Sequence, residues 1–120
     1  MTIPNSVKSI GEWAFYSCTS LETVTLGSGI TSISIGVFSG CTSLTNVVLP
    51  DSVTEIGDAV FQNCSNLESI TFSANVTEIG NQVIEKCSSL TTVYYKGTEE
   101  QWSAFRYTFR FSGQSVVFIS

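Results

Sequence analysis

The chain contains no histidine and few charged residues, with five basic and ten acidic side chains among its 120 residues. Histidine is the side chain used most often for acid–base catalysis and for activating nucleophiles. The net charge of −5 leaves too few basic groups to neutralise nucleic-acid phosphates or to hold an anionic membrane surface. These absences argue against nucleic-acid binding and against most catalytic arrangements.

Long apolar runs are also missing. No run approaches the roughly 20 residues of a membrane-spanning helix. The opening residues MTIPNSVKSI lack the apolar segment of a secretory signal peptide. Hydrophobic residues nevertheless make up 42% of the chain, which is enough for one continuous core in a single domain. Insertion into a membrane is therefore not expected.

The cysteines are regularly spaced. They are 23 residues apart (41−18, 64−41 and 87−64), at Cys18, Cys41, Cys64 and Cys87. Cut at that period, the chain contains four repeats that align without a gap, at residues 4–26, 27–49, 50–72 and 73–95. A fixed period of this length is typical of a solenoid, in which each repeat forms one coil.

Aligned repeats share their apolar positions. One column is invariant, namely Leu21, Leu44, Leu67 and Leu90, and another is nearly so, namely Phe15, Phe38, Phe61 and Ile84. A single repeat cannot bury its apolar face alone, so neighbouring coils bury their faces together. We expect each column to form a ladder of side chains along the axis.

Three kinds of local structure are predicted within a coil. The last six residues of each repeat predict a short parallel strand, because they end in an alternation of apolar and polar positions rich in β-branched residues. These segments are LETVTL, LTNVVL, LESITF and LTTVYY. A second, shorter run of extended chain is predicted from the segments VKSI, ITSI and, in both the third and fourth repeats, VTEI. EWAF, DAVF and NQVI predict one or two helical turns, with Glu12, Asp58 and Asn81 as N-caps.

The stretch CTSLTNVVLPDSVTEIGDAVF carries the full repeat pattern. The pattern resembles the BspA-like (Treponema pallidum-type) subclass of leucine-rich repeat proteins, and the resemblance covers residues 1–95. It implies an α/β fold, a right-handed solenoid with short parallel strands on its concave face and short helical turns between them. It also implies a surface or secreted protein of a host-associated microbe that takes part in adhesion and protein binding.

Residues 1–95 are interpreted as the repeat array. Ile3 falls in the column of Leu26, so the chain is expected to begin inside the last strand of a missing repeat. We interpret it as a fragment of a longer protein, and the alternative is a short protein with a degenerate start. Either way, the first coil presents an open edge, which predicts self-association.

Residues 96–120 are interpreted as a C-terminal cap of a helix and strands. Thr98 and Gln101 fit a capping box that opens a short helix through Trp102 and Phe105. RYTFRF, residues 106–111, alternates like a strand. SVVFI, residues 115–119, is expected to lie beside TTVYY as a final strand.

The four cysteines fit a ladder of buried thiols. Zinc sites place ligand pairs two to four residues apart, and a catalytic thiolate needs an activating base, so neither a metal site nor a catalytic residue is expected. Disulfides between neighbouring coils remain an alternative, because the spacing of parallel strands falls within disulfide range. Glu55 and Glu78 share a column; we interpret them as solvated acids, although paired carboxylates can also hydrolyse glycosides.

The candidate binding residues are the outward-facing positions of the predicted strands. They form a hydroxyl-rich, weakly acidic surface made of Glu22, Thr23, Thr25, Thr45, Asn46, Val48, Glu68, Ser69, Thr71, Thr91, Thr92 and Tyr94. Solenoids use such sheets to bind partners. We expect a non-catalytic domain without a cofactor that binds a protein, such as a host matrix protein. The alternative is a structural spacer within a longer surface protein.

Overall fold

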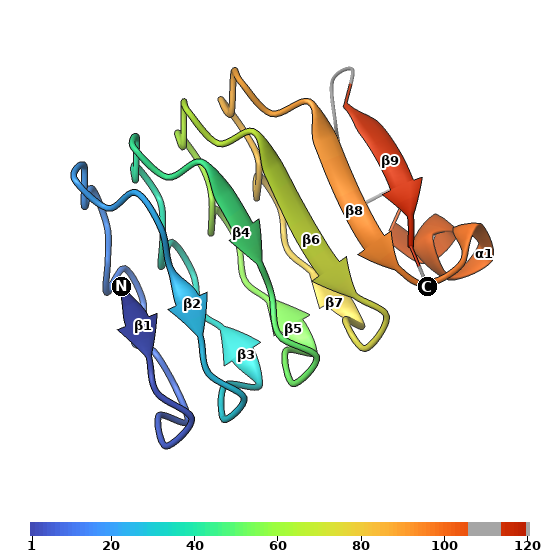
Figure 1. Ribbon diagram of the computed structural model, residues 1–120, viewed down its shortest axis with the longest axis horizontal. Helices are drawn as coiled ribbons and strands as arrows, with labels where there is room; N and C mark the ends of the chain where they lie inside the picture. The colour runs from blue at the N-terminus through green and yellow to red at the C-terminus, as the bar shows by residue number, and fades with distance from the viewer. Residues whose placement is uncertain (106–113, 120) are drawn as a thin grey trace.

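Each repeat folds into one coil, and equivalent positions of neighbouring coils lie side by side along the axis (Figure 1). The computed structural model describes residues 1–105 and 114–119. Within them the strands pair in parallel, and every strand-to-strand register joins residues 23 positions apart, as in Val47↔Ile70 and Ile70↔Val93. The repeat period therefore sets the register, as the sequence predicts.

One side of the solenoid is built from the ends of the repeats. Its strands are β1 (Thr2–Ile3), β2 (Thr25–Leu26), β4 (Asn46–Val48), β6 (Ser69–Ser73), β8 (Thr92–Lys96) and β9 (Ser115–Phe118). They form two sheets, in the orders β1-β2 and β4-β6-β8-β9. The predicted parallel strands are confirmed, but β2 and β4 do not pair, so the sheet is interrupted between the first and second repeats.

A second, narrower sheet runs along the other side of each coil. It consists of β3 (Ser32–Ile33), β5 (Glu55–Ile56) and β7 (Glu78–Ile79), in that order. Each strand buries its isoleucine and turns the preceding residue outward. The predicted second extended run is therefore confirmed for three repeats, whereas VKSI at residues 7–10 forms no strand.

The predicted helical turns between the strands are wrong, because the segments containing EWAF, DAVF and NQVI form hydrogen-bonded turns. Their alternate backbone N–H groups donate to carbonyls of the next coil. Thus Phe15 donates to Val37 (3.0 Å), Phe38 to Val60 (3.0 Å) and Phe61 to Val83 (2.9 Å). A helix would satisfy those N–H groups four residues back along its own chain.

Backbone conformation explains why no helix forms there. The second residue of each turn segment has a positive φ, at Trp13 (60°), Gly36 (68°), Ala59 (58°) and Gln82 (61°). A residue in this left-handed region interrupts the right-handed dihedrals that a helix requires. The predicted N-caps consequently cap no helix. Instead, the Asp58 carboxylate accepts a hydrogen bond from the Asn81 N–H of the next coil (2.8 Å).

Gly57 directly precedes the turn segment that begins at Asp58. A Cβ on Gly57 would come within 2.8 Å of the Ile35 backbone nitrogen, so the close approach of two coils requires glycine at this position.

The columns of apolar residues form the core. Leu44 and Leu67 are fully buried, and the ring of Phe38 stacks between those of Phe15 and Phe61 at centroid distances of 5.7 and 5.8 Å. The core is more open at the first coil, where four apolar side chains are only partly buried, namely Val7, Phe15, Cys18 and Leu21.

The cysteines form the expected thiol ladder, and all four are free. Three thiols donate to phenylalanine carbonyls, namely Cys41 to Phe15 (3.2 Å), Cys64 to Phe38 (3.1 Å) and Cys87 to Phe61 (2.9 Å). Burial raises the pKa of Cys41 and of Cys87 to about 11 and raises that of Cys64 further. These thiols therefore stay protonated near neutral pH, and their role is packing.

The C-terminal segment closes the far end of the array. Helix α1 (Glu99–Trp102) begins with the predicted capping box between Thr98 and Gln101 and continues into a 3-10 turn, η1 (Ser103–Phe105). Trp102 packs on Tyr95, with ring centroids 4.9 Å apart. The predicted strand RYTFRF lies outside the described residues. Within the described ranges, no helix has the length and apolar character needed to cross a membrane.

Candidate binding surface

The outward side chains of β2, β4, β6, β8 and β9, with the residues just before each strand, form one surface, here called the sheet face. Most of the predicted binding residues are exposed or half-buried there. The set comprises Glu22, Thr23, Thr25, Thr45, Asn46, Val48, Glu68, Ser69, Thr91, Thr92 and Tyr94. Thr71 is the exception, at 8% exposure, because the register places it between the larger side chains of Val48 and Tyr94.

The strand register sorts the sheet face into rows that run across the strands. One row contains apolar and aromatic side chains, since Val48, Thr71, Tyr94 and Val117 occupy consecutive strands. Val48 is 58% exposed and Val117 is 39% exposed. The row therefore presents apolar area on three strands of one sheet.

A neighbouring row is polar. It contains Asn46, Ser69, Thr92 and Ser115 in register. The Ser69 hydroxyl donates to the Asn46 side-chain oxygen (2.6 Å), which fixes the orientation of both groups. Polar groups held in this way can orient a partner beside the apolar row.

Strand β9 adds two residues to the sheet face that the sequence prediction left out, Ser115 and Val117. The predicted pairing of SVVFI with TTVYY is confirmed, with Ser115 beside Thr92. The signal was present in the sequence, because Val116 and Phe118 lie 23 residues after Val93 and Tyr95.

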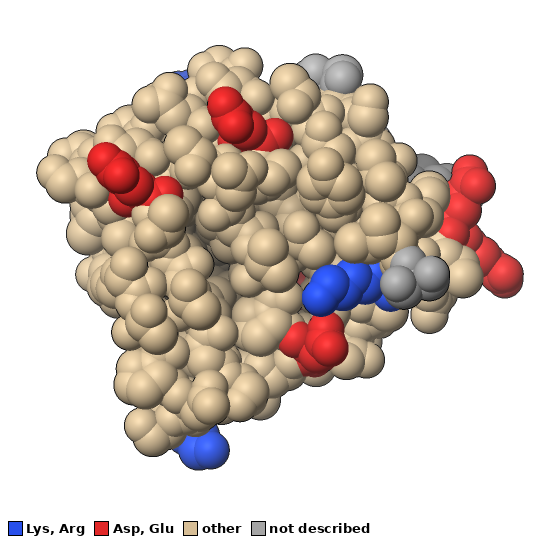
Figure 2. All heavy atoms as spheres, viewed as in Figure 1, with Lys and Arg blue, Asp and Glu red and all other residues tan. Residues whose placement is uncertain are grey.

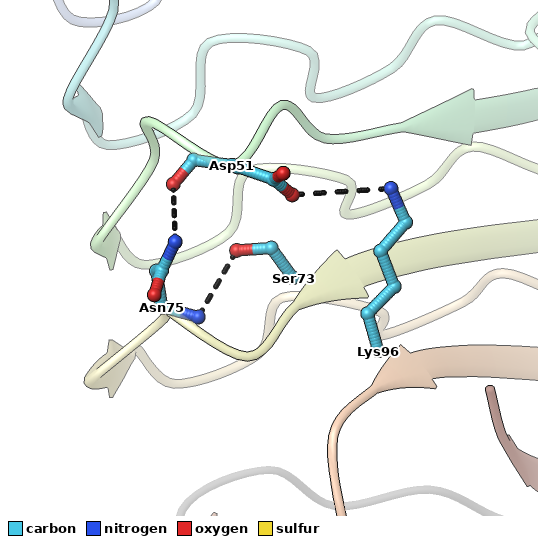
Figure 3. A network of polar contacts seen from close by, with 4 residues as sticks. All are labelled: Asp51, Ser73, Asn75 and Lys96. Atoms are coloured by element: carbon cyan, nitrogen blue, oxygen red, sulfur yellow. Dashed lines mark hydrogen bonds and ion pairs between the residues drawn. The ribbon is translucent and has the colours of Figure 1, made fainter. Parts of the chain in front are cut away.

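One edge of the sheet face is held by polar contacts that span three coils (Figure 3). The ammonium group of Lys96 lies 3.9 Å from the Asp51 carboxylate, reaching past Ser73 on the intervening coil. Asn75 donates its side-chain N–H to the Asp51 carbonyl (2.9 Å), and its backbone N–H donates to the Ser73 hydroxyl (3.2 Å). Since Lys96 and Asp51 are well exposed, their ion pair contributes little to stability.

Charge is sparse on the side of the molecule shown in Figure 2, where a few acidic and basic side chains stand on a largely uncharged surface. On the sheet face, Glu22 and Glu68 make no ion pair with another described residue. A partner would therefore meet hydroxyl, amide and apolar groups with a weak negative bias. Charged groups are depleted at the centres of protein interfaces, so this composition suits protein binding.

Carboxylates and thiols are the groups of this chain that could bind a metal ion or act in catalysis. Among residues 1–105 and 114–119, no group of three or more cysteine, aspartate or glutamate side chains is placed to hold a metal ion. Glu55 and Glu78 lie opposite each other on adjacent strands of the second sheet, away from the sheet face.

Parallel strands, one per repeat, with a buried column of leucines define a leucine-rich repeat solenoid. Residues 1–112 match six copies of the BspA type leucine rich repeat region. The chain belongs to this family, whose members are generally non-catalytic.

Two solved structures resemble most of the chain. A leucine rich cell surface protein from Faecalibacterium prausnitzii has 34% identity and a TM-score of 0.85, over 92% of this chain and 29% of that one. The leucine-rich repeat protein of Treponema pallidum has 35% identity and a TM-score of 0.75, over 78% of this chain and 44% of that one. The chain thus spans less than half of either relative. No curated protein matches it.

Proposed function

We propose that this chain is the binding part of a cell-surface or secreted protein and that it engages another protein through its sheet face. The observation that carries the proposal is the apolar row of Val48, Tyr94 and Val117 beside the polar row of Asn46 and Ser69. Interfaces commonly combine an apolar centre with oriented polar groups, and tyrosine is enriched at their energetic centres. The similarity to a leucine rich cell surface protein supports a location at the cell surface.

Binding to immobilised host matrix proteins, including fibronectin, collagen and laminin, tests this function. We expect saturable binding to one of them, and we expect Tyr94→Ser to weaken it by about 1–2 kcal/mol because an interface anchor is lost. Tyr16→Ser is the matched control, since Tyr16 is 55% exposed and lies on a corner turn away from the sheet face. Equal effects of the two substitutions would argue against the sheet face.

The competing function is a spacer that only extends other domains from a surface. The sparsely charged, threonine-rich sheet face favours it, because threonine is common in strands for structural reasons alone. Replacing the exposed sheet-face residues by serine in the full-length protein separates the two functions. Adhesion that survives this change would establish the spacer, and adhesion that disappears would support binding.

We also infer self-association through the first coil. Among the described residues, strand β1 pairs with β2 only, and Val7, Phe15 and Leu21 of the first coil are only partly buried. An edge strand next to open apolar side chains favours pairing with a second chain. Sedimentation velocity should show a mass that rises with concentration, whereas a constant monomer mass would contradict this inference.

A further inference from the structure

A groove on the opposite side of the solenoid from the sheet face has the features of a second binding site. It has a volume of about 480 Å³ and is lined by residues of three successive coils and of η1. Gly57 and Gly80 lie in its wall, and Ile35 and Phe105 also line it. A Cβ on either glycine would collide with the preceding coil, so glycine at these positions lets successive coils approach closely along the groove wall.

The groove combines apolar walls with negative charge. Ile35 is 37% exposed, and Ala104 on η1 is exposed as well. Asp58 and Glu78, both exposed, also line the groove, and neither makes an ion pair with another described residue. A ligand that fits must therefore bring both apolar area and positive charge.

Repulsion between Glu55 and Glu78 also favours a positively charged ligand. Glu55 faces Glu78 directly across β5 and β7, and like charges directly opposite each other destabilise a sheet. A cation bound at Glu78 would reduce this repulsion as well as pair with the carboxylate. A bare metal ion fits less well, since no group of three or more ligating side chains is placed to hold one among residues 1–105 and 114–119.

We propose that this groove binds a short segment of a partner protein in which an arginine or lysine lies beside aliphatic residues. The basic group pairs with Asp58 and Glu78, and the aliphatic neighbours pack on Ile35 and η1. The chain would then bind proteins on two faces, one largely uncharged and one acidic.

A blocked peptide containing Leu-Arg-Leu between glycines tests the proposal, with amide shifts in NMR spectra as the readout. We expect saturable shifts at Gly57 and Gly80, and weaker binding when salt rises from about 50 to about 500 mM. The same peptide with neutral citrulline in place of arginine should bind much more weakly. Equal binding of the two peptides would overturn the proposal.

Two double variants locate the site. Asp58→Asn with Glu78→Gln should weaken peptide binding about tenfold, because two ion pairs are lost. Asparagine keeps the side-chain oxygen that accepts from the Asn81 N–H, so the fold should be preserved. Glu12→Gln with Glu85→Gln removes the same charge at positions that do not line the groove and should leave peptide binding unchanged.

Three other results would contradict binding of a basic protein segment in the groove. Peptide-induced shifts confined to the sheet face would overturn the assignment of the site. Displacement of the peptide by calcium ions would show a metal site, and binding of a neutral oligosaccharide in place of the peptide would show a carbohydrate site. Either result would contradict a basic protein segment as the ligand. Because Tyr94→Ser leaves the groove intact, failure here is distinct from failure of binding at the sheet face.

Discussion

Replacing Phe38 by alanine should lower the free energy of unfolding by about 3–5 kcal/mol. The Phe38 side chain is fully buried, and its ring stacks on Phe15 and on Phe61 in the neighbouring coils. Its removal would leave a cavity between two coils, and the stack cannot close without shifting backbone that is hydrogen-bonded from coil to coil. Chemical denaturation of the variant and the parent measures the difference.

The matched control is Phe15→Ala. Phe15 occupies the same column, but it is only partly buried and stacks on one ring alone. We expect less than half the loss seen at Phe38. Equal losses at the two positions would mean that the first coil is as well packed as the second, contrary to the structure.

Gly36→Ala should cost about 2 kcal/mol or more, from two separate sources. Gly36 has a φ of 68°, where an added Cβ costs about 1–2 kcal/mol. That Cβ would also overlap the indole of Trp13, which covers Gly36 from the preceding coil. The free energy of unfolding from chemical denaturation measures the total cost.

Two controls separate these sources. In a Trp13→Ala background the overlap disappears, so Gly36→Ala should cost only the part due to its left-handed conformation. Gly11→Ala places a methyl group where no atom lies within 4 Å and should change stability by less than about 0.5 kcal/mol. If Gly36→Ala costs the same with and without Trp13, the indole does not cover Gly36.

The repeat period was sufficient to predict how the coils stack. Because equivalent residues recur every 23 positions, the pairing of Ser69 with Thr92 follows from the alignment alone. The same rule extends to β9 through Val116, so Val117 could have been added to the candidate surface. Burial of Thr71 could not be read from alternation, since it depends on the size of its neighbours on adjacent strands.

The corner turns were less predictable because the residue types at their positive-φ positions vary from repeat to repeat. Each corner has two residues with a positive φ, and the first of the two is Trp13 in one repeat and Gly36, Ala59 and Gln82 in the others. Only Gly36 favours that conformation intrinsically. Stacking imposes it elsewhere, because the N–H groups of each corner must reach the next coil. Tertiary hydrogen bonding therefore overrides the local preference for helix that EWAF and DAVF suggest.

The most direct test of the stacked coils is the scalar coupling across hydrogen bonds in NMR, which identifies the carbonyl acceptor of each amide. The account predicts that the amides of Phe15, Phe38 and Phe61 couple to carbonyls 22 residues later in the chain, at Val37, Val60 and Val83. Couplings to carbonyls four residues earlier would show helices at the corners and would contradict the account.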